Sequence, residues 1–143
     1  MIKVPDRIYI DKKDRMLYNK LDQVNLLRFK GERGRTRKEQ FIFALAIGFD
    51  NNLSIPLETK EGWFNTRDLQ PEDRMLFNAI ALYKQKTEEV LLNEIDIFKI
   101  IEEYAHVGIK ILCDKVKSTQ FESFSKRLEK ELFDLYDKIK IKR

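Results

Sequence analysis

Apolar residues recur at helical spacing over most of the chain, and this pattern predicts about five helices. Asp11 can cap the first of them, and the second, residues 37–49, is apolar on nearly every side and is expected to be buried. Pro71 suits the start of a third helix, and Asn93 can cap a long fourth one. Residues 121–140 repeat apolar side chains every three to four positions, which predicts an amphipathic C-terminal helix.

Two short stretches have β character. Arg7-Ile-Tyr-Ile10 alternates polar and apolar residues and predicts one strand near the N-terminus. Residues 62–66 form either a second short strand or aromatic cover for the core. The predicted fold is therefore mostly α, a single compact helical domain of about five helices with a short N-terminal β element. We divide it into a strand–helix–turn–helix front part (1–49), a helical core (50–117) and a C-terminal amphipathic helix (118–143).

Composition narrows the class of protein further. The 143 residues suffice for about one domain, 43% are apolar, and the 36% that are charged nearly balance. Cys113 is the only cysteine, so an internal disulfide is excluded. The chain has no signal-peptide pattern and no apolar run near the roughly 20 residues that a membrane span needs. We expect a cytoplasmic protein without membrane contact, and the Lys- and Ile-rich, Gly-poor composition suggests a prokaryotic source.

The basic excess is concentrated in residues 28–39. This segment holds six Lys or Arg and two Glu, a local charge of +4 that equals the net charge of the whole chain. It ends in Thr36-Arg-Lys-Glu39, which has the spelling of a capping box, so the cations gather at a helix N-terminus whose amides attract anions. The pattern predicts a nucleic-acid site in which the helix end at Thr36 supplies amides and four side chains neutralise phosphates. These four are Arg33, Arg35, Arg37 and Lys38.

The order of elements in the front part resembles that of ribbon-helix-helix DNA-binding proteins. The resemblance implies a homodimer in which strands of two protomers pair, with Arg7 and Tyr9 on the face that contacts the DNA groove. Two features depart from that family: the first helix is longer, and residues 31–35 add a loop. The alternative is a strand packed on its own chain beside a solvated basic turn.

The basic, Thr-capped segment that leads into Phe41-Ile-Phe-Ala-Leu-Ala-Ile-Gly-Phe49 also resembles DndE of the dnd DNA-phosphorothioation systems. About the first 115 residues are similar to small dnd-associated proteins. The motifs that carry this similarity are Arg7-Ile-Tyr-Ile10, Gly48-Phe49, Pro56-Leu57, Gly62-Trp-Phe64, Pro71-Glu-Asp-Arg74 and Ile101-Glu-Glu-Tyr-Ala105. The resemblance implies a non-catalytic accessory protein of DNA modification or antiviral defence, with DNA a better expectation than RNA.

Catalytic chemistry has little support in the sequence. His106 is the only histidine, which excludes a His-rich metal site, and we expect it to be a partly exposed structural residue. Cys113 is expected to be an inert, half-buried thiol. No motif indicates a metal, a cofactor or an enzymatic activity, and an uncharacterised hydrolase would need two ionisable groups in a cleft with shifted pKa values.

Two further alternatives stay open. Trp63 and Phe64, beside Asn65 and Arg67, either close the core or form a platform for base stacking. The second concerns function: the chain could instead be a protein-interaction subunit that assembles a larger defence complex through its C-terminal helices.

Overall fold

The computed structural model describes residues 5–23, 37–118 and 130–139, and in these ranges it contains five α-helices and one two-stranded sheet. The mostly α fold with a small β element is therefore confirmed. Its elements are β1 (Arg7–Asp11), η1 (Lys12–Asp14), α1 (Arg15–Gln23), α2 (Arg37–Asp50), β2 (Lys60–Asn65), η2 (Thr66–Asp68), α3 (Pro71–Gln85), η3 (Glu88–Leu92), α4 (Glu94–Ser118) and a helix over residues 130–139.

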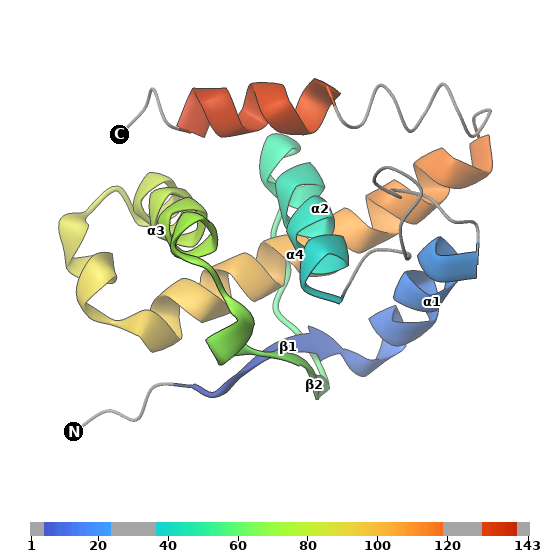
Figure 1. The fold of residues 1–143 in the computed structure, drawn as a ribbon, viewed down its shortest axis with the longest axis horizontal. Helices are drawn as coiled ribbons and strands as arrows, with labels where there is room; N and C mark the ends of the chain where they lie inside the picture. Colours follow the sequence, from blue (N-terminus) through green and yellow to red (C-terminus); the bar gives the residue numbers. More distant parts are fainter. Residues whose placement is uncertain (1–4, 24–36, 119–129, 140–143) are drawn as a thin grey trace.

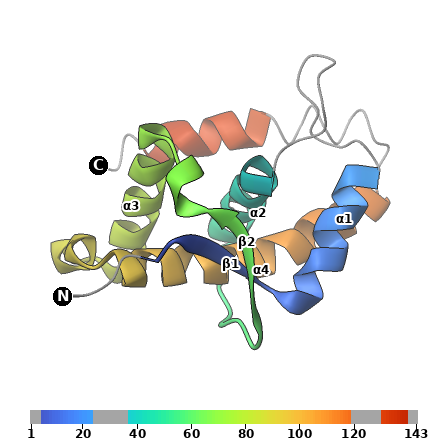
Figure 2. The ribbon, with the colours of Figure 1, turned by 60° about the horizontal axis from the view of Figure 1, so that its bottom comes forward.

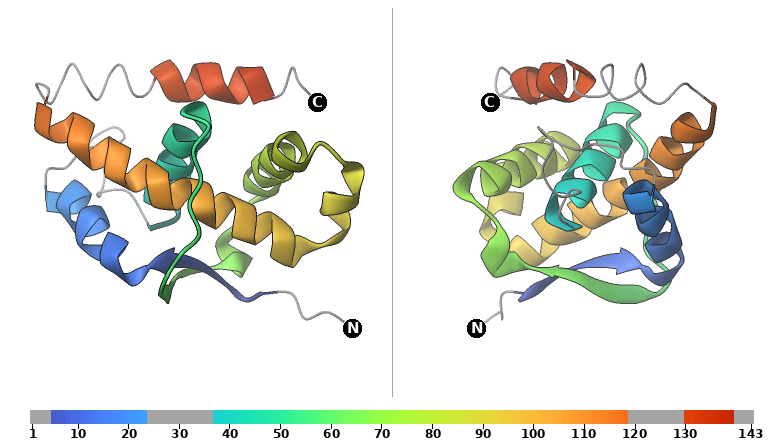
Figure 3. Two further views of the ribbon diagram at one scale, coloured as in Figure 1. Left: turned by 180° about the vertical axis from the view of Figure 1, so that it is seen from behind. Right: turned by 45° about the vertical axis from the view of Figure 1, so that its right-hand side comes forward.

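Helix α4 is the axis around which the other elements pack. It runs along the long dimension of the molecule, α2 crosses it, and the helix over residues 130–139 lies across the far end of α2 (Figures 1 and 3). The start of α4 is capped as its sequence predicts, because the Asn93 Oδ1 accepts hydrogen bonds from the amides of Ile95 (3.0 Å) and Asp96 (3.4 Å).

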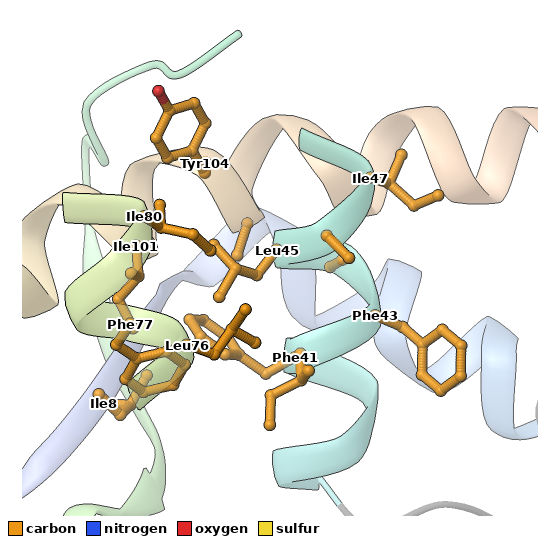
Figure 4. Packing of buried hydrophobic residues seen from close by; sticks show 14 of the residues in the cluster. Ile8, Phe41, Phe43, Leu45, Ile47, Leu76, Phe77, Ile80, Ile101 and Tyr104 are labelled. Atoms are coloured by element: carbon orange, nitrogen blue, oxygen red, sulfur yellow. The ribbon is translucent and has the colours of Figure 1, made fainter. Parts of the chain in front are cut away.

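Helix α2 is the most deeply buried helix of the described part. Every residue from 40 to 48 is buried, as its nearly continuous apolar sequence predicts. Figure 4 shows that α2 packs on two sides. Phe41 and Leu45 point toward α3, whereas Phe43 and Ile47 point to the opposite side. On that side, Phe43 and Ile47 face Leu135 of the C-terminal helix.

The crossing of α2 and α4 brings the two backbones into contact at a pair of glycines. A Cβ atom on Gly108 would lie 1.6 Å from the carbonyl oxygen of Ala44, and one on Gly48 would lie 2.0 Å from that of Tyr104. These neighbours are backbone atoms inside helices, so they cannot move aside as a side chain could. Only glycine at both positions permits this approach.

Strand β1 pairs with β2 of its own chain, in antiparallel register from Arg7↔Asn65 to Asp11↔Lys60, with a bulge between Ile8 and Tyr9. The intersubunit ribbon implied by the ribbon-helix-helix resemblance is therefore wrong. The physical reason is that residues 60–65 supply the missing partner strand, while Ile8 (0% exposed) and Ile10 (3%) anchor β1 in the core. Residues 62–66 thus include a true strand, and the outer face of the ribbon is uncovered by any described helix (Figure 2).

Both ends of the ribbon are pinned by side chains. At one end, the buried carboxylate of Asp11 accepts hydrogen bonds from the amides of Lys13 (3.0 Å), Glu58 (2.9 Å) and Thr59 (3.4 Å). Burial alone would raise the pKa of Asp11, but these backbone donors outweigh it and hold the pKa well below its usual value. At the other end, Thr66 donates through its amide and its hydroxyl to the carbonyls of residues 6 and 5.

At the crossing of α2 and α4, we expect a change from glycine to alanine to destabilise the protein, although the same change usually stabilises a helix. Replacing glycine by alanine inside a helix normally stabilises it by about 1 kcal/mol. At Gly48 or Gly108 the added methyl group must push two backbones apart, so we expect Gly48→Ala and Gly108→Ala each to lower the free energy of unfolding by about 3 kcal/mol. Urea-induced unfolding of the wild type and the two variants measures this loss of stability.

The matched control is Gly62→Ala in β2. Its added Cβ would meet only the flexible side chain of Arg7, 2.5 Å from Nε, which can move aside. We expect this change to cost less than about 1 kcal/mol. A Gly108→Ala protein as stable as the wild type would contradict the close crossing.

Candidate nucleic-acid interface

Arg37 is the first residue of α2 and lies against β2. Its guanidinium stacks 4.1 Å from the centroid of the Trp63 ring, and its Nη1 donates to the Trp63 carbonyl at 3.2 Å. The side chain remains exposed, and no carboxylate pairs with it in the described part. The stacking holds the guanidinium plane in place while other N–H groups remain available for an anion.

Lys38 has a different environment. Its Nζ lies 3.0 Å from the Asp73 carboxylate and donates to the Asp68 carbonyl at 3.3 Å. Asp73 also accepts a hydrogen bond from the Gln70 amide at 2.8 Å, so one carboxylate both caps α3 and balances Lys38. Lys38 therefore ties the start of α2 to the start of α3, and a phosphate contact by Lys38 would have to compete with this ion pair.

Arg7 and Tyr9 lie on the outer side of the ribbon, as their alternation with Ile8 and Ile10 predicts. The Arg7 side chain crosses β2 at Gly62, where the lack of a Cβ makes room for it. Arg7 is exposed, whereas Tyr9 is only half-exposed. Arg33, Arg35 and Thr36, the remaining residues of the predicted site, lie outside the described residues.

Trp63 and Phe64 belong to the core and form no platform for base stacking. Trp63 is 3% exposed and Phe64 is 7% exposed. The indole is already in contact with two protein groups: Tyr18 packs against it at 5.0 Å between ring centroids, and Arg37 stacks on it. Phe64 packs edge-on against Phe41 at 5.5 Å.

A polar stripe on α4 holds the N-terminal elements. It consists of Glu102, His106 and Cys113, whose spacing places them on one side of the helix. Glu102 accepts a hydrogen bond from the Tyr9 amide at 2.9 Å, and Cys113 donates to the Leu17 carbonyl at 3.5 Å. Each member thus contacts a different N-terminal element, which fixes β1 and α1 on the helix axis.

His106 was expected to be partly exposed, and that prediction is wrong. The residue is 7% exposed, and its Nδ1 lies 2.5 Å from Oδ2 of the buried Asp14. Burial raises the pKa of Asp14, although the hydrogen bond to His106 and the charge of Lys110 oppose the rise. Asp14 Oδ1 and the Tyr18 hydroxyl are buried without a hydrogen-bond partner in the described part. Cys113, expected to be half-buried, is buried.

Glu102 is the second buried acid of this region and was not predicted. Burial raises its pKa from 4.5 to about 7, while the hydrogen bond from the Tyr9 amide and the charge of Lys60 act in the opposite direction. In the sequence it belongs to Ile101-Glu-Glu-Tyr-Ala105 and stands four residues before His106, a spacing that places both on one side of a helix. In the described ranges, no group of three or more His, Cys, Asp or Glu is placed to hold a metal ion.

The sequence of the chain identifies its family. The profile described as DNA sulphur modification system-associated protein 4 matches residues 7–138, nearly the whole chain. The protein therefore belongs to this family, which confirms the resemblance to small dnd-associated proteins. No curated protein and no solved structure shows significant similarity to it. Across the described ranges, no helix has both the length and the apolar character that a membrane crossing requires.

The pKa of Glu102 predicts how stability depends on pH. Between pH 4.5 and about 7 the folded state keeps a proton on Glu102 that the unfolded chain has lost, so the free energy of unfolding falls as pH rises through this window. At about 1.4 kcal/mol per pKa unit, the fall is on the order of 3 kcal/mol. Glu102→Gln should abolish this component, measured as the difference between wild type and variant in urea unfolding at several pH values.

Glu131→Gln is the control, because Glu131 is an exposed acid on the C-terminal helix. The difference in free energy of unfolding between the wild type and this variant should not change with pH. A Glu102→Gln protein whose stability tracks the wild type from pH 4.5 to pH 8 would show that Glu102 titrates as an ordinary surface acid.

Proposed function

We propose that this member of the DNA sulphur modification-associated family is a non-catalytic accessory protein that binds DNA through the outer face of the ribbon and the start of α2. The observation that carries the proposal is the distribution of arginine pairing. Arg15 and Arg74 form ion pairs with Glu61 and Glu94. The other described arginines, Arg7, Arg37 and Arg67, have no carboxylate partner among the described residues, and all of them lie on or beside the ribbon.

The positions of Arg7 and Arg37 support a shared ligand. Arg7 crosses β2 at Gly62, and Arg37 donates to the carbonyl of Trp63, the next residue along the strand. Two guanidinium groups at adjacent residues of a pinned ribbon can contact neighbouring phosphates of one backbone, with little ordering cost when they bind. Arg67 lies in η2, directly after β2.

The positive charge of the segment before α2 supports an anionic partner. Asp6 and Asp68 are exposed near the ribbon, and the described residues, with 18 Lys or Arg and 21 Asp or Glu, carry no positive excess of their own. Arg33 and Arg35 precede Arg37 by four and two residues, in the segment that holds the net charge of +4. The exposed start of α2 adds helix-dipole attraction. DNA is favoured over RNA because the family is associated with a DNA sulphur modification system.

A second candidate function, assembly of a larger defence complex, is favoured by the apolar surface around the C-terminal helix. Phe133 is 64% exposed and Met75 is 46% exposed. They border an open groove of about 490 Å³ between α3 and the helix over residues 130–139, together with Leu76, Tyr136 and Ile139. Exposed aromatic and methionine side chains around a groove are typical of protein contact sites.

The DNA proposal predicts how affinity depends on salt. Each phosphate neutralised contributes about −0.9 to the slope of log affinity against log salt, so the wild type should show a slope of roughly −3 to −4. Arg7→Gln and Arg37→Gln should each weaken binding and make the slope shallower by about 1. Fluorescence anisotropy with a labelled DNA duplex measures both quantities, and an RNA duplex of equivalent sequence tests the preference for DNA.

Arg15→Gln is the matched control, since it removes the same charge from an arginine that already pairs with Glu61. It should leave the slope unchanged. Equal slopes for wild type, Arg7→Gln and Arg37→Gln would sink the DNA proposal and favour the assembly function.

A further inference from the structure

The exposed side of η1 and α1 is cationic, and the DNA contact proposed for the ribbon and the start of α2 does not use it. Residues 12–20 expose no acid, because their one carboxylate, Asp14, is 1% exposed and contacts the buried His106. The exposed side chains of this stretch are Lys12, Lys13, Arg15, Met16, Asn19 and Lys20. We call this set the α1 face.

Ion pairing leaves two cations of the α1 face unmatched. Lys13 and Arg15 each form an ion pair of 3.0 Å with a glutamate of β2 or of the loop before it. Lys12 and Lys20 have no ion-pair partner in the described part of the chain. They stand eight positions apart with Met16 midway, a spacing of four that places neighbours on one side of a helix.

The adjoining turn of α4 does not offset this charge. It lies beside α1, because Cys113 donates to the Leu17 carbonyl. Asp114 is exposed on this turn, but Lys110, four residues earlier and therefore on the same side of the helix, is exposed as well and balances it. The positive charge of the α1 face is therefore available to an anionic partner.

The α1 face is held next to the ribbon. Strand β1 leads through η1 directly into α1 along one side of the molecule (Figure 2). The Lys12 amide donates to the Thr59 carbonyl at 3.1 Å. On the inner side of α1, Tyr18 packs on Trp63 of β2, the residue on which Arg37 also stacks. One indole thus joins α1 to both parts of the proposed DNA contact.

We propose that the α1 face extends the DNA contact, with Lys12 and Lys20 neutralising phosphates beyond those that the ribbon meets. This inference rests on the proposed function, because it requires a duplex on the ribbon. The five residues of β1 span about 17 Å and the nine of α1 about 14 Å, so together they reach over at most roughly 30 Å, or about nine base pairs. A duplex carries one charge per about 1.7 Å of its axis, so one that continues past η1 brings phosphates to both lysines.

The salt dependence of binding tests the inference through a comparison of the wild type with Lys12→Gln/Lys20→Gln. On a duplex of about 20 base pairs, the slope of log affinity against log salt should be shallower by about 2 for the double variant. The slope of roughly −3 to −4 expected of the ribbon and the start of α2 is then that of the variant. On a hairpin of about 6 base pairs, roughly 20 Å long and too short to reach both surfaces, the two proteins should have the same slope. Fluorescence anisotropy measures all four slopes.

Two controls make the comparison specific. Lys86→Gln with Lys130→Gln removes two other exposed lysines, one at the end of α3 and one on the C-terminal helix, and should keep the wild-type slope. Met16→Ser alters the α1 face without changing its charge and should keep that slope too. Every altered position is exposed, so the fold is expected to persist, and circular dichroism checks this.

The outcomes separate this inference from the proposed function. A double variant with the wild-type slope on the longer duplex overturns the inference alone, and leaves the α1 face to a partner of another class, such as an acidic protein. If Arg7→Gln and Arg37→Gln change nothing while Lys12→Gln/Lys20→Gln does, the ribbon proposal fails and the α1 face stands as the binding surface. A wild type that binds neither duplex overturns both.

Discussion

The contact between the backbones of α2 and α4 is the constraint on which the rest of the structure depends. Gly48 and Gly108 let the two helices meet with no side chain between them, and this sets how α4 is turned. Once the glycine side of α4 faces α2, its polar stripe must face the N-terminal elements. The hydrogen bond from the Tyr9 amide to Glu102 and the contact between Asp14 and His106 then hold β1 and η1. A packing requirement in the core thus determines where the ribbon lies.

The ribbon connects this architecture with the proposed function. It is fastened to α4 through Glu102, closed at one end by Asp11 and at the other by Thr66, and its outer face is left open. Arginines placed on a fastened ribbon lose little conformational freedom when they meet phosphates. Because the ribbon is fastened through the buried acid Glu102, the free energy of unfolding is expected to depend on pH, although the surface charge is nearly balanced.

Local features could be predicted from the sequence, whereas features that need distant partners could not. The burial of α2 and the caps at Asp11 and Asn93 follow from residues close together in the chain. The residues that pair with β1 lie 49 to 58 positions away in the sequence, and the short strand itself fits pairing within or between chains equally well. His106 lies off the main apolar stripe of α4, which suggests exposure. In the structure it is buried and contacts Asp14, 92 residues earlier, and this long-range contact could not be predicted from the sequence.

Chemical-shift mapping can establish whether the fastened ribbon and the start of α2 form the DNA-binding face. The amide resonances of the isotopically labelled full-length protein would be followed while a DNA duplex is added. We expect the largest shifts on β1, on β2 around Gly62 and Trp63, and on the first turn of α2. Shifts confined to η3 or to the helix over residues 130–139, or no shifts when the protein is saturated with DNA, would contradict it.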